Sequence, residues 1–370
     1  MAKLYLHIGM DKTGTSAIQN YLFINKDRLL TGYALLYPDA GMWLDYSHHK
    51  FAFSIMEMHG YRIGDLDELF NNLKREMSDD CDVLISSECL FKAPNKNGFA
   101  EFKRQLDELF HKIIVIVYVR RQDEWVESRY RHSIVSETEI DIDKLSGPWF
   151  CNYKQHIDKW AEIVGKDNVI VRPYERQQFV GGSIYSDFLY SITDIQNDGL
   201  VQPHCRVNAS FGPAQVAFKR LCNKVGLTRS AISRFQKLYN KWILDFDVID
   251  CLNGILISNT SQEQSEVRHV FLSHEKRVAL MDMYRCINQE IAREYLSRSD
   301  DVLFFSSPQH ERAGEVYQGL NSCEINMLMR FVREQNKHVY KQIISSARKS
   351  VKSADPDVRM AAEMLLSAAD

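Results

Sequence analysis

Three observations predict an α/β fold for the 370-residue chain, with a parallel sheet flanked by helices and a helical C-terminal extension. Short apolar runs alternate with helical patterns over the first half of the chain, as in βαβ units. One of these runs, Ile113–Val119, has the continuous β-branched composition of a buried parallel strand. Beyond about residue 210 only helical patterns remain, which indicates a different architecture there.

The first strand and helix follow each other directly. Leu4–Ile8 is a short apolar run that ends at Gly9, as expected for a buried strand. A helix should begin near Thr15, with Thr15 or Ser16 as its N-cap. Its apolar positions lie on one helical face, which comprises Ile18, Leu22 and Leu29.

The later elements repeat this alternation. Three further strands are expected at Asp82–Ser86, Ile113–Val119 and Val169–Val171. Helical patterns cover Phe99–Phe110 and Gln122–Val135, and in the last third Gln215–Val225, Ser273–Leu296 and Cys323–Ser346. We therefore expect an α/β core over residues 1–210 and a mainly helical extension over residues 211–370 that packs on it.

The composition excludes several classes of protein. Hydrophobic residues make up 45% and charged residues 26%, which is typical of globular proteins and not of disordered, collagen-like or membrane-bundle sequences. A net charge of −3, from 46 basic and 49 acidic residues, argues against a nucleic-acid-binding protein. The sequence contains no apolar run long enough to cross a membrane and no secretion signal, and its eight cysteines form no CxxC pair. We expect a cytoplasmic protein with reduced cysteines.

The loop between the first strand and the first helix, GMDKTGTS, has the components of a phosphate-binding site. Backbone N–H groups and a helix N-terminus together attract anions. Gly9 and Gly14 allow close approach of the backbone, Lys12 adds a positive charge, and hydroxyl groups come from Thr13, Thr15 and Ser16. The lysine precedes Gly14 by two positions, so the loop is not a Walker A motif. The alternative is an ordinary glycine-containing turn with a capping hydroxyl.

A second anion site is expected after the strand Ile113–Val119. Arg120 follows that strand directly, and Ser128 lies eight residues later in a predicted helix. Open α/β sheets bind ligands at the carboxyl ends of their strands, where these two side chains can converge on one anion. A solvated, charged helix start is the alternative interpretation.

Together, the two motifs resemble those of sulfotransferases that use 3′-phosphoadenosine 5′-phosphosulfate (PAPS), of the bacterial or carbohydrate-directed kind. The resemblance covers about residues 1–215 and implies a P-loop NTPase-like fold, with PAPS as the sulfuryl donor and 3′,5′-adenosine bisphosphate as the product. It assigns the 5′-phosphosulfate to Lys12, Thr13, Gly14, Thr15 and Ser16, and the 3′-phosphate to Arg120 and Ser128.

The sequence departs from the family pattern in two places. Gln122 stands where the family often has proline, and Arg121 forms a pair with Arg120, which leaves open which arginine reaches the phosphate. Arg206 could supply a second cation at the 3′ end of the nucleotide, although the usual Arg-Lys-Gly form of that loop is absent.

The reaction also needs a base for the acceptor hydroxyl. Glu88 follows the second strand, Asp82–Ser86, beside the first loop, and the resemblance to carbohydrate sulfotransferases favours a glutamate base. His48 or His49 is the alternative, since other sulfotransferases use a histidine. No metal is expected, because the sequence shows no aspartate and hydroxyl arranged for Mg²⁺ and no ligand cluster around the histidine pair. The resemblance implies a carbohydrate or glycolipid acceptor.

Two other functions compete with this interpretation. A P-loop-type small-molecule kinase would bind ATP with Mg²⁺, and a degenerate scaffold would bind a nucleotide without transferring any group. Separately, the basic stretch Lys337–Lys352 is expected to be a solvated helix face, with a peripheral membrane or glycolipid contact as the alternative.

Overall fold

The computed structural model describes residues 2–78, 80–136, 142–145, 147, 151–192, 199–203, 212–227, 251–253, 255–256, 269–310 and 314–369. The chain divides into two compact units that are interleaved along the sequence. The first unit comprises Met1–Gln122, Cys151–Val207 and Met281–His310, and the second comprises Asp123–Phe150, Asn208–Leu280 and Glu311–Asp370. The single division predicted after residue 210 does not describe these units.

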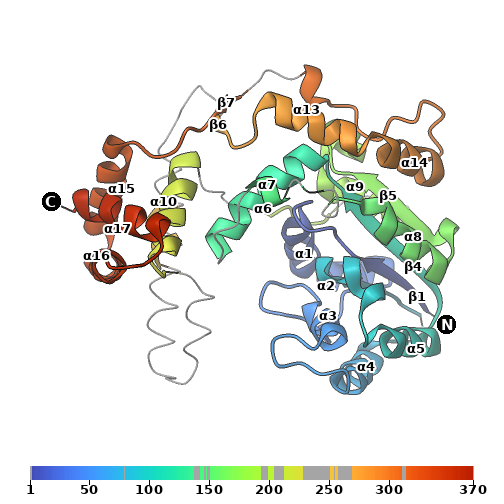
Figure 1. Cartoon of the computed structure of the whole chain (residues 1–370). Coiled ribbons are helices and arrows are strands. Elements are labelled where there is room, and N and C mark those ends of the chain that lie inside the picture. The colour runs from blue at the N-terminus through green and yellow to red at the C-terminus, as the bar shows by residue number, and fades with distance from the viewer. Residues whose placement is uncertain are drawn as a thin grey trace. The chain divides into compact units, whose positions relative to one another are not determined.

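The first unit is built on a five-stranded parallel sheet with the strand order β2-β3-β1-β4-β5 (Figure 1). The strands are β1 (Ala2–His7), β2 (Leu35–Leu36), β3 (Asp82–Ser86), β4 (Phe110–Val119) and β5 (Val169–Pro173). The predicted fold class, a parallel sheet flanked by helices, is confirmed. The sequence did not predict β2, whose two residues are too few to form a recognisable apolar run.

Helices surround this sheet. They are α1 (Thr15–Ile24), α2 (Lys26–Tyr33), α3 (His49–Met56), α4 (Asp65–Glu76), α5 (Phe99–Leu109), α8 (Tyr153–Val164), α9 (Ile184–Ile192) and α14 (Arg285–Leu296). Short 3-10 turns are η1 (Glu88–Asn95), η2 (Lys166–Asn168), η3 (Arg176–Gln178), η4 (Val180–Gly182) and η5 (Pro308–His310).

The first predicted helix differs from the observed one in two respects. The observed helix ends at Ile24, before the predicted face position Leu29, and its C-cap is Asn25, whose side-chain amide donates to the carbonyls of Tyr21 at 2.8 Å and Val201 at 3.0 Å. The N-cap is Gly14 rather than Thr15 or Ser16, and no side chain caps the helix. The first turn is therefore capped by backbone alone.

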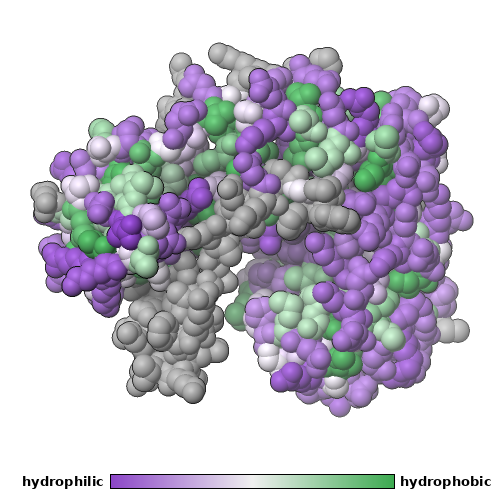
Figure 2. Space-filling model, in the orientation of Figure 1, coloured by the Kyte–Doolittle hydropathy of each residue, from purple (hydrophilic) through white to green (hydrophobic). Residues whose placement is uncertain are grey.

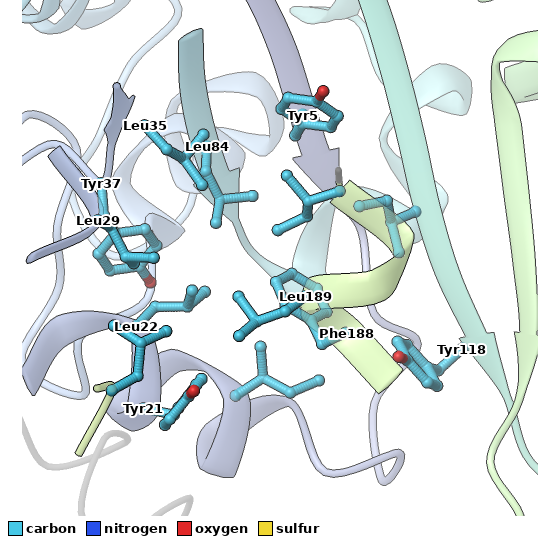
Figure 3. Close-up of a cluster of buried hydrophobic side chains, with 14 residues drawn as sticks. Tyr5, Tyr21, Leu22, Leu29, Leu35, Tyr37, Leu84, Tyr118, Phe188 and Leu189 are labelled. Carbon is cyan, nitrogen blue, oxygen red and sulfur yellow. The ribbon is translucent and has the colours of Figure 1, made fainter. Parts of the chain in front are cut away.

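One face of the sheet packs against α1, α2 and α9 (Figure 3). Tyr5, Leu84 and Tyr118 point to this face and meet Tyr21 of α1 and Phe188 of α9, all almost fully buried. Because side chains alternate along a strand, the intervening residues point to the other face, and α5 and α8 pack against β4. With both faces covered, ligands can reach the sheet only at its ends.

The second unit is mainly helical. Its elements are α6 (Gln122–Ser136, which begins in the first unit), α7 (Ile142–Leu145), α10 (Pro213–Lys224), β6 (His269–Val270), α13 (His274–Met283, which ends in the first unit), β7 (Glu315–Val316), α15 (Ser322–Gln335), α16 (Lys337–Ser350) and α17 (Pro356–Ser367). Asp123 of α6 forms a buried ion pair with Arg277, 2.6 Å away. Glu127 accepts the N–H groups of Phe271 and Leu272, both at 2.7 Å.

The basic stretch in the second unit forms α16, which buries Val339, Ile343 and Ala347 and leaves its lysines and arginine exposed. A membrane contact of this face stays a prediction. None of the described helices combines the length and apolarity needed to cross a bilayer.

Gly41 lets the backbone of the first unit lie close to a buried aromatic ring. Its φ is +77°, and a Cβ there would lie 2.2 Å from a ring carbon of the fully buried Phe51. Gly60 has a similar φ of +86° with no atom within 4 Å of such a Cβ, so Gly60→Ala is a control for backbone strain alone. In urea unfolding we expect Gly41→Ala to cost about 1–3 kcal/mol more than Gly60→Ala. Equal costs would contradict the packing argument.

Candidate active site

The loop from β1 to α1 is held in a conformation that requires glycine at two positions. Gly9 has a φ of +91° and Gly14 a φ of +80°, and a Cβ on Gly14 would lie 2.7 Å from Ile184 Cδ1. Lys12 between them also has a left-handed backbone, with a φ of +65°. The Thr13 hydroxyl donates to the Met10 carbonyl at 2.5 Å, and Thr13 is fully buried. This hydrogen bond within the loop therefore stabilises its conformation.

The loop leads into the N-terminus of α1. The Gly14 carbonyl accepts the N–H groups of Ala17 and Ile18, at 3.0 and 3.1 Å. The preceding N–H groups, those of residues 14–16, have no protein acceptor in the described part of the chain. No acidic residue lies in the first turn of α1. Together with the Lys12 side chain, this helix end offers an electropositive site for an anion.

Arg120 lies against this loop. Its Nη1 donates to the Lys12 carbonyl at 3.0 Å, and its guanidinium lies over the ring of Tyr174, 5.5 Å from the centroid. Arg121 is fully buried and donates to Ser306 Oγ at 2.8 Å. Of the arginine pair, Arg120 is thus the one beside the loop.

Two further residues of the predicted nucleotide site, Ser128 and Arg206, stay predictions. Ser128 is half-buried on α6, within the second unit, so its relation to the loop stays a prediction. Arg206 lies outside the described residues.

Glu88 lies on the other side of the loop, at the end of β3. A Cβ on Gly9 would come 2.5 Å from Glu88 Cβ, so the backbone at Gly9 touches this residue. Glu88 Oε2 accepts a hydrogen bond from Gln19 Nε2 of α1 at 2.9 Å, and 18% of its side chain remains exposed. The carboxylate is therefore both fixed and accessible.

The two neighbouring histidines have different surroundings. His48 is fully buried; its Nδ1 accepts the Ser86 N–H at 3.1 Å, and its Nε2 can donate to the Pro38 carbonyl at 2.8 Å. Burial lowers the pKa of His48 to about 4. His49 instead has its Nε2 3.9 Å from Glu88 Oε1. His48 is thus occupied by the backbone, whereas His49 faces the carboxylate.

Two residues near Glu88 were not singled out from the sequence. Gln19 is fully buried and also donates to Ser86 Oγ at 3.3 Å, and Asp45 Oδ2 lies 3.6 Å from His49 Nε2. A signal for Gln19 existed, because it is three residues before Leu22 and so shares the buried helical face. No such pattern marks Asp45. Tyr174, which follows the predicted strand Val169–Val171, meets both Gly14 and Arg120. Among the described residues, no group of three or more potential ligands is arranged for a metal ion.

Comparisons with known proteins give two similarities. No family model matches the chain. An uncharacterized protein of Archaeoglobus fulgidus is 23% identical over 262 residues, which are 70% of this chain and 64% of that protein's length. The crystal structure of a sulfotransferase from Alicyclobacillus acidocaldarius has a TM-score of 0.39 to this structure at 14% identity, over 64% of this chain and 97% of that one. Similarity at these levels does not establish a function, so the assignment depends on the residues of the site.

Proposed function

We propose that this chain is a sulfotransferase that moves the sulfuryl group of PAPS to an acceptor hydroxyl by in-line displacement. The observation that supports this best is the contact between the two motifs. Arg120 Nη1 donates to the Lys12 carbonyl at 3.0 Å, although the residues are 108 positions apart in the chain. One bisphosphorylated nucleotide could bridge the loop and the arginine.

The loop and the arginine would divide the donor between them. Lys12 and the N–H groups of residues 13–16 would bind the 5′-phosphosulfate, and Lys12 would stabilise charge on the bridging oxygen as the S–O bond breaks. Arg120 would bind the 3′-phosphate, with Ser128 and Arg206 as further ligands. Because its hydroxyl already donates to the Met10 carbonyl, Thr13 would contribute only its backbone N–H.

The acceptor would be activated by Glu88. Its carboxylate would take the hydroxyl proton while the acceptor oxygen attacks sulfur, so that the nucleotide bisphosphate leaves and no metal is needed. His49, 3.9 Å from Glu88, is the second candidate for the base. His48 is excluded from this proposal because backbone groups occupy both its nitrogens. The resemblance to carbohydrate sulfotransferases supports a carbohydrate or glycolipid acceptor.

Donor binding can be tested by thermal unfolding with 3′,5′-adenosine bisphosphate, with ADP, and with ATP and Mg²⁺. At 100 times its dissociation constant the bisphosphate should stabilise the protein by about 2.7 kcal/mol. We expect Lys12→Ala to abolish this stabilisation. Lys112→Ala, which changes an exposed lysine near the amino end of β4, should retain it. Stabilisation by ATP with Mg²⁺, but not by the bisphosphate, would indicate a kinase. The absence of stabilisation by any of the nucleotides would overturn the proposal.

A further inference from the structure

Four rings from the segment around α3 form a cluster beside the proposed base. Trp43, Phe53, His59 and Tyr61 constitute what we call the aromatic patch. Phe53 is central, with its ring centroid 5.3 Å from Trp43, 4.4 Å from His59 and 6.1 Å from Tyr61. Its ring also lies 5.5 Å from that of His49, which connects the patch to Glu88.

The patch is open to solvent. Phe53 is buried beneath the other three rings, of which Trp43 and Tyr61 are half-buried and His59 is exposed. Leu44 next to the patch is 89% exposed, and non-polar residues are visible on this part of the first unit in Figure 2. Exposed non-polar surface beside a functional site is typical of ligand binding.

The loop that carries Trp43 is firmly held. The Trp43 N–H donates to the Ser47 carbonyl at 2.7 Å, and the Tyr46 N–H donates to the Trp43 carbonyl at 3.1 Å. Tyr46, with a left-handed φ of +66°, stacks on Phe23 of α1 at 4.0 Å, and its carbonyl accepts the Tyr37 hydroxyl at 2.6 Å. Strained backbone held by its surroundings is common in ligand-binding loops. The patch is thus preorganised.

Carboxylates gather between the patch and the loop of Lys12. Asp45, half-exposed, lies 3.6 Å from His49, which itself lies 3.9 Å from Glu88. The pKa of the Cys89 thiol is raised to about 12 by burial and by the charges of Glu88, Asp11 and Asp45. An acceptor with its own negative charges would be repelled here.

We propose that the aromatic patch and Asp45 bind an uncharged sugar ring of the acceptor, with one hydroxyl directed toward Glu88. A sugar presents C–H groups on one face, which match the negative face of an aromatic ring. Its edge hydroxyls can donate to the Asp45 carboxylate, for which the described residues supply the Ser47 N–H and hydroxyl as donors, both to Oδ1. This inference rests on the proposed function and narrows its acceptor to neutral sugars, as opposed to sulfated or uronic ones.

Saturation-transfer NMR of the full chain tests this, using methyl glycosides of neutral sugars, methyl glucuronide and phenol, each with and without 3′,5′-adenosine bisphosphate. Neutral glycosides should bind, with the strongest transfer to the C–H groups of one ring face. Trp43→Ala and Tyr61→Ala should raise the dissociation constant about five- to tenfold. Tyr190→Ala, which removes a 60% exposed ring from α9, should leave it unchanged. Asp45→Asn should let methyl glucuronide bind.

Three results would overturn this inference: binding of glucuronide or phenol as tight as that of the neutral glycosides, unchanged binding in Trp43→Ala, or no glycoside binding. The bisphosphate arm separates this outcome from failure of the proposed function. Stabilisation by bisphosphate without glycoside binding removes only the sugar site. If glycosides bind in a way that depends on Trp43 but the bisphosphate does not stabilise the protein, the sulfotransferase proposal is wrong and the sugar site is retained.

Discussion

Replacing Glu88 with glutamine should lower kcat about 10²–10⁴-fold, the range expected for the loss of a general base. The amide cannot take a proton from the acceptor, but its carbonyl oxygen can still accept the hydrogen bond that Gln19 donates at 2.9 Å. The fold and the donor loop should therefore be retained. The measurement is the release of 3′,5′-adenosine bisphosphate from PAPS at saturating donor, with the panel of methyl glycosides as acceptors.

Two variants make this result specific. Glu57→Gln changes an exposed glutamate at the end of α3 and should leave kcat unchanged. His49→Gln removes the other candidate base, 3.9 Å from Glu88. Should His49→Gln lose the activity while Glu88→Gln keeps it, the histidine is the base. Stabilisation by the bisphosphate, measured on each variant, shows whether donor binding is intact.

The sheet could be predicted because its buried strands carry their own signal. Leu4–Ile8 and Ile113–Val119 are continuous apolar runs, as expected for parallel strands covered on both faces. The interleaving of the two units carries no local signal, because it depends on contacts between distant segments. Arg121, for example, donates to Ser306, 185 positions later in the chain.

The site was only partly predictable, because it too depends on contacts between segments that are distant in the chain. Lys12 and Arg120 could be chosen because each directly follows a strand, and strand ends meet at one edge of a parallel sheet. The sequence could not distinguish His48 from His49, which are adjacent and chemically identical. The structure separates them, because both ring nitrogens of His48 are hydrogen-bonded to backbone groups of Pro38 and Ser86. Tyr174 contacts Gly14 and Arg120 because it follows β5, which pairs with β4.

Asp187→Ala should destabilise the first unit by about 3–5 kcal/mol, because it leaves the half-buried Arg172 cation unpaired and the buried Tyr118 hydroxyl without its acceptor. Asp187 is fully buried on α9 and accepts hydrogen bonds from Arg172, from the Tyr118 hydroxyl at 2.7 Å and from the Val180 N–H at 2.9 Å. Burial lowers the pKa of Arg172, but the hydrogen bond and charge of Asp187 raise it above its ordinary value. An arginine side chain stays protonated in proteins, so a cation remains once its partner is removed. Urea unfolding of the wild type and the variant measures the difference.

Comparison with an exposed pair shows why this loss should be large. Glu101→Ala removes one of the two carboxylate partners of Arg104 on the surface of α5, where water and Glu108 still stabilise the charge, and it should cost far less than Asp187→Ala. Adding Arg172→Met to Asp187→Ala removes the stranded cation and should recover part of the stability, as a double-mutant cycle would record. Equal losses for Asp187→Ala and Glu101→Ala would contradict the argument. Because Arg172 directly precedes Pro173 and Tyr174, the same ion pair fixes the strand end that supports Gly14 and Arg120.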